Sequence, residues 1–281
     1  MLKYMLLMTV FLFASVSHAQ DVWKDADAEI AKNAKVEESA QAEQNTQSEE
    51  NTQSEENTQN EDNEPDLINN MEETVALWTV DDVQKAYDNG FGMNTKDFKG
   101  NTPLYYALSR NLSLDVVKKI IELGANVNEP AANGMLPINV PTSKANELQL
   151  QILMMKTMGL DMSNPKIESE LEKNVFHEMS RMTEATAILI DAGADVNKES
   201  VLGTPLMNAA TNKWNTEIIN LLIKYHADVN KRDKNGRTAL FYAFSSGNDD
   251  IVSLLIQAGA NTEITDKDGR TYMELERTEI K

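Results

Sequence analysis

The chain has 281 residues, no cysteine and a formal net charge of −19 at pH 7. The absence of cysteine excludes disulfides, thiolate metal ligands and a catalytic thiol. Nucleic acid is not expected as a partner, because we find no cluster of lysine and arginine that could release counterions from phosphates.

Residues 1–19 have the pattern of a secretory signal peptide. Lys3 supplies the basic start, Met5 to Val16 form the apolar centre, and Ser17-His18-Ala19 fits a cleavage site flanked by small residues. The apolar centre is shorter than the ~20 residues that a membrane span needs. We therefore expect cleavage after Ala19, with a retained signal anchor as the alternative. The sequence predicts an exported protein, periplasmic or secreted, with no stable membrane span after cleavage.

Residues 20–66 form an acidic, low-complexity linker. Residues 21–66 hold 15 acidic and three basic residues, so this segment carries most of the negative charge. Asn45 to Pro65 repeats the unit Asn-Thr-Gln-Ser-Glu-Glu and offers no apolar side chain for burial. Ordering such a segment would cost ~1–2 kcal/mol per residue with no buried surface to offset it. We predict a disordered linker before a folded part that spans residues 67–281.

A short motif recurs at steady spacing through residues 67–281. Its fullest copy is Gly193-Ala194-Asp195-Val196-Asn197, and related copies begin at residues 90, 124, 159, 226 and 259. The copies that begin at Gly90 and Gly159 are the weakest. Steps of 33 to 35 residues indicate a stacked repeat architecture. We expect Gly193 at the left-handed C-cap of a helix, with Asp195 and Asn197 bonding the turn that follows.

A second motif keeps the same phase. "GNTPLYYAL" starts at Gly100, "GTPLMNAA" at Gly203 and "GRTALFYAF" at Gly236. The threonines of these copies can cap a short helix, and in two copies Pro103 and Pro205 occupy its first turn, where a missing N–H costs little. These threonines are Thr102, Thr204 and Thr238. A second helix, apolar at i, i+3 and i+4, follows in each unit.

Two helices and a glycine-initiated hairpin in about 33 residues, with Thr-Pro-Leu and Gly-Ala-Asp-Val-Asn, resemble the ankyrin repeat. The resemblance covers residues 67–281. It implies an all-α ankyrin-repeat solenoid of about six units, in which inner helices line a concave face and hairpin tips project from it. The first unit lacks Thr-Pro-Leu and the last has only a first helix, so both are expected to cap the stack.

The units over residues 129–197 depart from this pattern. Leu136 replaces the capping threonine, and Pro141 is expected to stop or kink the first helix. A long second helix should then run from Asn146 to Gly159, and another unit with a short inter-helix loop should follow. We predict two irregular repeats here, with a local change of curvature.

No catalytic or phosphate-binding motif occurs in the sequence. The stretch Asp266 to Gly269 has part of a calcium-loop pattern but lacks the further carboxylates, so we interpret it as a hairpin turn. A remote alternative is an enzyme or metal site in the irregular middle, built on His177, Glu178 and Glu184. We therefore expect no enzyme activity, no cofactor and no metal.

The resemblance implies that variable residues at hairpin tips and on the inner-helix face bind a protein partner. Phe98 and Trp214 stand out because aromatic residues dominate interface hot spots, although Trp214 could equally pack locally. The expected function is a monomeric, non-enzymatic, exported binding module, with a secreted effector or adhesin-like surface protein as the alternative. The candidate residues come from three units: Phe98, Lys99, Asn101, Tyr106 and Arg110; Ser200, Val201, Asn208, Asn212 and Trp214; and Lys234, Asn235, Arg237 and Tyr242.

Overall fold

The computed structural model describes residues 64–157 and 165–275. The predicted signal peptide (1–19) and nearly all of the predicted linker (20–66) lie outside the described residues, as do the weak motif copy at 159–163 and the last six residues. Within the described ranges the regular elements are helices, with no β-strand. None of these helices is long and apolar enough to cross a membrane.

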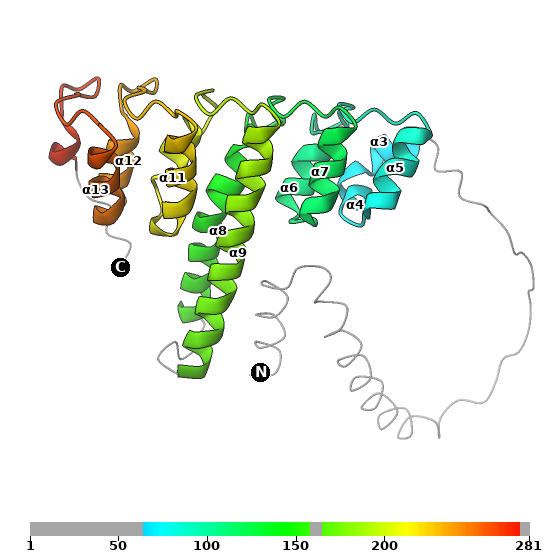
Figure 1. Cartoon of the computed structure of the whole chain (residues 1–281), viewed down its shortest axis with the longest axis horizontal. Helices are drawn as coiled ribbons and strands as arrows, with labels where there is room; N and C mark the ends of the chain where they lie inside the picture. Colours follow the sequence, from blue (N-terminus) through cyan, green and yellow to red (C-terminus); the bar gives the residue numbers. More distant parts are fainter. Residues whose placement is uncertain (1–63, 158–164, 276–281) are drawn as a thin grey trace, which may run out of the picture. The chain divides into compact units, whose positions relative to one another are not determined.

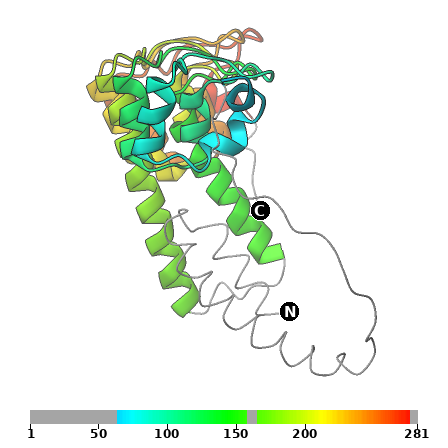
Figure 2. The ribbon, with the colours of Figure 1, turned by 90° about the vertical axis from the view of Figure 1, so that its right-hand side faces the viewer.

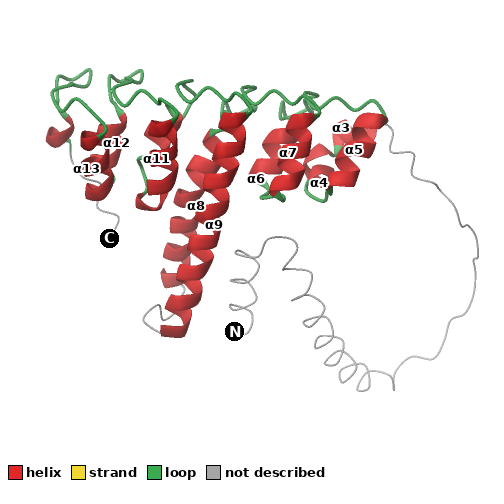
Figure 3. Ribbon diagram, viewed as in Figure 1, coloured by secondary structure: helices red, strands yellow, loops and turns green. Residues whose placement is uncertain are grey.

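The helices lie in pairs along a row (Figure 1). The first helices of the pairs contact one another in succession and form one layer, whereas α5 contacts α7 and α9 contacts α11 in the other layer. The loops that join one pair to the next lie along the same edge of the row (Figure 3). After α3 (Glu64–Asn69), the pairs are α4 (Met71–Val75) with α5 (Val80–Asp88), α6 (Pro103–Ser109) with α7 (Leu114–Glu122), α8 (Asn139–Thr157) with α9 (Pro165–Asp191), α10 (Pro205–Ala209) with α11 (Thr216–Lys224), and α12 (Ala239–Ser245) with α13 (Asp249–Gln257).

Threonine caps start two of the inner helices as predicted. The Oγ1 of Thr102 accepts a hydrogen bond from the backbone N–H of Tyr105, and Thr204 accepts one from Met207, both at 3.3 Å. Thr238 occupies the same N-cap position before α12 but makes no capping hydrogen bond through its side chain. Capping satisfies one of the backbone donors that a helix leaves free at its start.

The predicted left-handed cap at Gly193 is confirmed, with a φ of 92°. The N–H of Asn197 donates to Oδ1 of Asp195 at 2.8 Å, so these two residues bond the following turn as expected. His226 replaces this glycine in the next repeat and also has a positive φ, of 66°. The turn thus demands the same backbone conformation even where the residue has a side chain.

An asparagine ladder ties the base of each hairpin to the next repeat. Each asparagine donates through Nδ2 to the carbonyl of the residue with positive φ that ends the next outer helix. Through Oδ1 it accepts the N–H two residues further on, and the distances are between 2.6 and 3.2 Å. The pairs are Asn94 with Gly124 and Asn126, Asn128 with Gly193 and Asp195, Asn197 with His226 and Asp228, and Asn230 with Gly259 and Asn261.

The predicted pair of irregular repeats over 129–197 is wrong, because α8 and α9 form one elongated pair. The ladder steps directly from Asn128 to Gly193 across this pair. Pro141 does not stop the helix because it is the third residue of α8, where backbone N–H groups have no intrahelical acceptor. With 19 and 27 residues, α8 and α9 extend well beyond the ends of the neighbouring helices (Figures 1 and 2).

The described C-terminal end is closed by one 3-10 turn, η2 (Tyr272–Glu274), where the sequence predicted a capping helix. Tyr272 is buried, and its ring packs edge-on against Phe244 with 5.3 Å between the centroids. An aromatic contact therefore covers the end of α12 within the described residues.

Candidate partner-binding surface

An aspartate three residues before the glycine organises three of the hairpin tips. Oδ1 of Asp97 accepts the N–H of Asn101 at 2.9 Å. Oδ1 of Asp233 likewise accepts from Asn235 and Arg237, each at 2.8 Å. These carboxylates fix the backbone of each tip from inside, so the residues between the aspartate and the glycine can face solvent.

Two tyrosines hold these aspartates in place from the inner helices. The hydroxyl of Tyr106 donates to Oδ2 of Asp97, and that of Tyr242 to Oδ2 of Asp233, both at 2.6 Å. Burial, followed by the bond to Asp97, raises the pKa of Tyr106 to about 12. Burial, followed by the bond to Asp233, also raises the pKa of Tyr242. The expectation that Tyr106 faces a partner is wrong, because its side chain is only 3% exposed.

Phe98 lies in the N-terminal tip, between Asp97 and Gly100, and 72% of its surface is exposed. The Nζ of Lys99 lies 5.6 Å from the centre of its ring and 2.6 Å from Oε2 of Glu72. Arg110 also pairs with Glu72, and bonds from Lys99 and then Arg110 lower the pKa of that carboxyl. Phe98 is therefore free to bind, whereas the two cations are partly committed to the first repeat.

Asn101 connects the N-terminal tip to the next one. Its Nδ2 donates to the Tyr106 hydroxyl at 3.0 Å, and its Oδ1 accepts the N–H of Ala132 at 3.0 Å. Both ends of its amide are therefore engaged within the protein, so its role in the structure is to join two tips.

Two candidate asparagines of the middle repeat are buried and hold α8. Asn208 is 6% exposed and donates to Oγ1 of Thr142 at 2.7 Å. Asn212 is 1% exposed and donates to Oε1 of Gln149 at 2.7 Å. Their predicted exposure on the concave face is wrong, because the long α8 presents polar side chains that these amides bond.

The exposed part of the middle repeat is its tip. Val201 is 63% exposed, between Ser200 and Gly203, which exchange two backbone hydrogen bonds of 3.0 Å. Trp214 lies half-buried in the 3-10 turn η1 (Lys213–Asn215), and its N–H donates to Oδ1 of Asn212 at 3.0 Å. Val201 is thus presented by a closed turn, and Trp214 is held partly within the stack.

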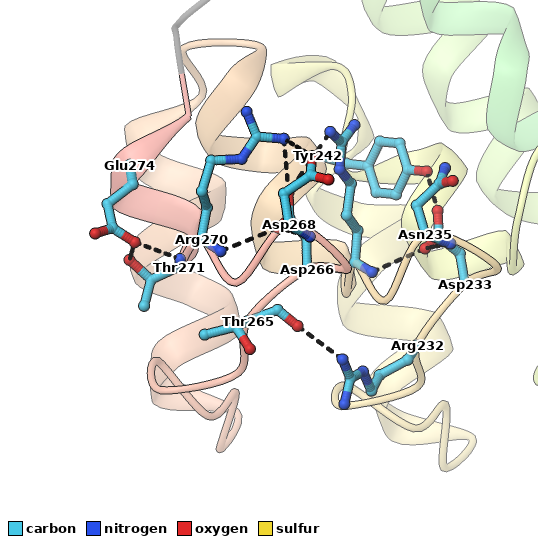
Figure 4. A network of polar contacts seen from close by, with 11 residues as sticks. Arg232, Asp233, Asn235, Tyr242, Thr265, Asp266, Asp268, Arg270, Thr271 and Glu274 are labelled. Atoms are coloured by element: carbon cyan, nitrogen blue, oxygen red, sulfur yellow. Dashed lines mark hydrogen bonds and ion pairs between the residues drawn. The ribbon is translucent and has the colours of Figure 1, made fainter.

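A network of ion pairs joins the two C-terminal tips (Figure 4). Oδ2 of the buried Asp266 lies 3.0 Å from Nη2 of Arg270 and 3.8 Å from Nη2 of Arg237. Although burial alone would raise the pKa of Asp266, hydrogen bonds from Arg270 and from the Asp268 backbone lower it below its ordinary value. Arg232 donates to the carbonyl of Thr265 at 2.7 Å, on the neighbouring tip.

The exposed residues of this C-terminal region include Lys234 and Asn235. The backbone carbonyl of Asn235 accepts the N–H of Lys267 at 2.9 Å, which couples the two tips directly. Lys234 and Asn235 therefore project from a backbone that is fixed on both sides.

The residues of the remote catalytic alternative do not converge. His177 is exposed, while Glu178 is buried and accepts a hydrogen bond from Asn111 at 3.1 Å. Glu184 lies 3.6 Å from Nζ of Lys118 on α7. Over residues 64–157 and 165–275, no group of three His, Cys, Asp or Glu side chains is placed to hold a metal ion.

Comparison with known proteins finds ankyrin repeats in two parts of the chain. The family model "Ankyrin repeats (3 copies)" matches residues 177–268, and the model "Ankyrin repeat" matches residues 99–132. An ankyrin repeat protein of fowlpox virus (strain NVSL) is 46% identical over 41 residues. That segment makes up 15% of this chain and 8% of the viral protein, so the chain spans only a small part of this relative.

Proposed function

We propose that this chain, in which ankyrin repeats are found at residues 99–132 and 177–268, is a non-enzymatic module that binds a protein partner. One observation carries the proposal: Phe98 and Val201 are 72% and 63% exposed on tips whose backbones are closed by internal hydrogen bonds. Apolar side chains on a rigid backbone lose little conformational entropy when a partner covers them.

The proposed contact surface is smaller than the set of residues that the sequence suggested. It comprises the tips with Phe98, Val201, Lys234 and Asn235, and the exposed part of Trp214 at the turn between α10 and α11. Aromatic and apolar anchors contribute most of the free energy of binding in protein interfaces. We therefore assign Phe98 the largest contribution.

Photo-crosslinking tests this surface. A photoreactive amino acid at position 98 or 201 of the full chain should give partner adducts of defined mass. The same substitution at Ile256, which is 41% exposed on α13, is the matched control and should give none. Adducts that are absent at 98 and 201, or equally abundant at 256, would contradict the assignment.

Export from the cytoplasm is the second part of the proposal, with a secreted effector or adhesin-like surface protein as its alternative form. It is supported by the sequence of residues 1–19. Fractionation into periplasm, cell surface and medium, with mass spectrometry of the mature N-terminus, tests it. Export predicts a mature chain that begins at Gln20, and an intact N-terminus in the cytoplasm would contradict it.

A further inference from the structure

The two C-terminal tips concentrate positive charge in a chain with a net charge of −19. Residues 231–237, "KRDKNGR", hold four basic residues and one acidic residue, so the expectation that the chain has no cluster of lysine and arginine is wrong. Lys267 and Arg270 follow on the adjacent tip, which hydrogen bonds hold against the first. We call these six side chains the basic edge: Lys231, Arg232, Lys234, Arg237, Lys267 and Arg270.

The acidic residues of the same tips pair with only two of the six side chains. Asp266 lies beside Arg237 and Arg270, and Asp268 pairs with Arg270. Asp233 is bonded to backbone N–H groups and to Tyr242, and the side chain of Asp266 is 2% exposed. Arg232 donates to the backbone carbonyls of Gly236 and Thr265. Among the described residues, no carboxylate lies within 4 Å of the charged groups of Lys231, Arg232, Lys234 or Lys267. Their four charges are open to a partner.

The two remaining arginines of the edge also have unused hydrogen-bonding capacity. Arg237 and Arg270 approach the same oxygen of Asp266. The Nε of each is buried and has no acceptor among the described residues. A buried donor without an acceptor costs free energy, and guanidinium groups match carboxylates in geometry. The side chains of Arg237 and Arg270 are nevertheless 34% and 43% exposed, so each remains partly accessible to a carboxylate at this edge.

We propose that the basic edge binds a segment of the protein partner that is rich in aspartate or glutamate. This inference rests on the proposed function, since it assigns a chemistry to one part of the same surface. The tips offer no aromatic side chain on which bases could stack, because "KRDKNGR" and "TDKDGR" contain none, and this disfavours single-stranded nucleic acid. The acidity of the rest of the chain would repel the same segment elsewhere and so favour this position.

Fluorescence anisotropy with the full chain and a labelled glutamate-rich peptide tests the proposal. The variant K231Q/K234Q/K267Q should bind about tenfold more weakly, because three exposed charges are removed. Added salt should weaken binding by the wild-type protein, because it screens exposed charges. The matched control K156Q/K213Q/K224Q removes three exposed lysines away from the edge and should bind as the wild type does.

Several results would overturn the inference. These are equal binding of a peptide with glutamine in place of glutamate, equal losses in the two triple variants, no measurable binding, and tighter binding of a nucleic acid oligomer. Crosslinking from position 98 separates this inference from the proposed function. If crosslinking persists while the acidic peptide fails to bind, only the charge assignment is wrong, whereas loss of both removes the binding function itself.

Discussion

The buried hydroxyl of Tyr106, which donates to Asp97 in the N-terminal tip, makes the stability of the protein depend on pH. Its pKa is raised to about 12, so the folded state favours the protonated form. Burial of this hydroxyl and its hydrogen bond to Asp97 both favour the protonated form. The stability that they contribute is complete below the ordinary tyrosine pKa of about 10, and it is lost as pH rises through about 12. Urea unfolding should therefore show a steeper loss of stability above pH 10 for the wild type than for Tyr106→Phe. Tyr105→Phe, on the adjacent half-exposed residue, should keep the wild-type slope; equal slopes in all three proteins would contradict the assignment.

His226 carries a strained backbone at the position where the other repeats have glycine. A residue with a Cβ in the left-handed region costs about 1–2 kcal/mol, and glycine avoids this cost. His226→Gly should therefore raise the free energy of unfolding by about 1 kcal/mol. The ladder bond from Asn197 is made to the backbone carbonyl of His226, so the substitution leaves it in place.

The control for this change is His226→Ala. Alanine keeps the Cβ at a φ of 66° and should bring no gain. Thermal or urea unfolding of the three proteins measures the difference. A gain with alanine that equals the gain with glycine would show that the imidazole, and not the backbone, limits stability at this position.

Among the helices, α8 was predicted least well from the sequence, because it continues through Pro141. If the helix runs unbroken from Asn139 to Thr157, Pro141→Ala should change stability little, because Pro141 lies in the first turn. Leu150→Pro should cost about 3 kcal/mol or more, because it removes a hydrogen bond from the middle of the helix. Leu150 is 57% exposed, so Leu150→Ala controls for the lost side chain. Circular dichroism and urea unfolding check both; a large effect of Pro141→Ala with none of Leu150→Pro would support the interrupted helix instead.

The regular repeats could be predicted because their motifs carry local backbone requirements. Gly193 must adopt a positive φ, and Thr102 and Thr204 cap helices, so each unit shows its boundaries in the sequence. The middle could not be predicted in the same way. Gly159 to Ser163 fits the repeat spacing and therefore suggests a repeat boundary. Whether Pro141 interrupts a helix depends on where that helix begins, which the sequence does not mark. The helices α8 and α9 pack against each other as one pair, and motif spacing alone does not show this pairing.

The candidate surface was predictable only in part, for a related reason. Phe98 and Val201 are exposed as tip residues should be, but an asparagine can serve a partner or the interior equally well. Asn208 and Asn212 are buried, because side-chain oxygens of α8 accept hydrogen bonds from their amides. The aspartates of the tips were missed, although Asp97 and Asp233 both stand nine residues before a tyrosine. That shared spacing was the signal in the sequence.

The elongated pair joins two sets of regular repeats, so the polar contacts between α8 and α10 decide whether the stack unfolds as one unit. Stability in such stacks is close to a sum over repeats and their interfaces. This interface already contains buried polar atoms without partners among the described residues, on Asn139 and Asn215. It is therefore the joint at which we expect cooperativity to fail first.

Asn208→Ala should weaken this joint by about 1–3 kcal/mol, because it leaves the buried oxygen of Thr142 with one donor fewer. Fluorine NMR of fluorotryptophan-labelled protein can follow Trp78 before the joint and Trp214 after it. In the wild type both native signals should vanish at the same urea concentration, and in the variant they should separate. Asn235→Ala, on an exposed tip, is the control and should keep them together. If the two signals of Asn208→Ala still vanish together at a lower urea concentration, the coupling across α8 is stronger than one buried amide, and the packing of α9 against α11 must carry it.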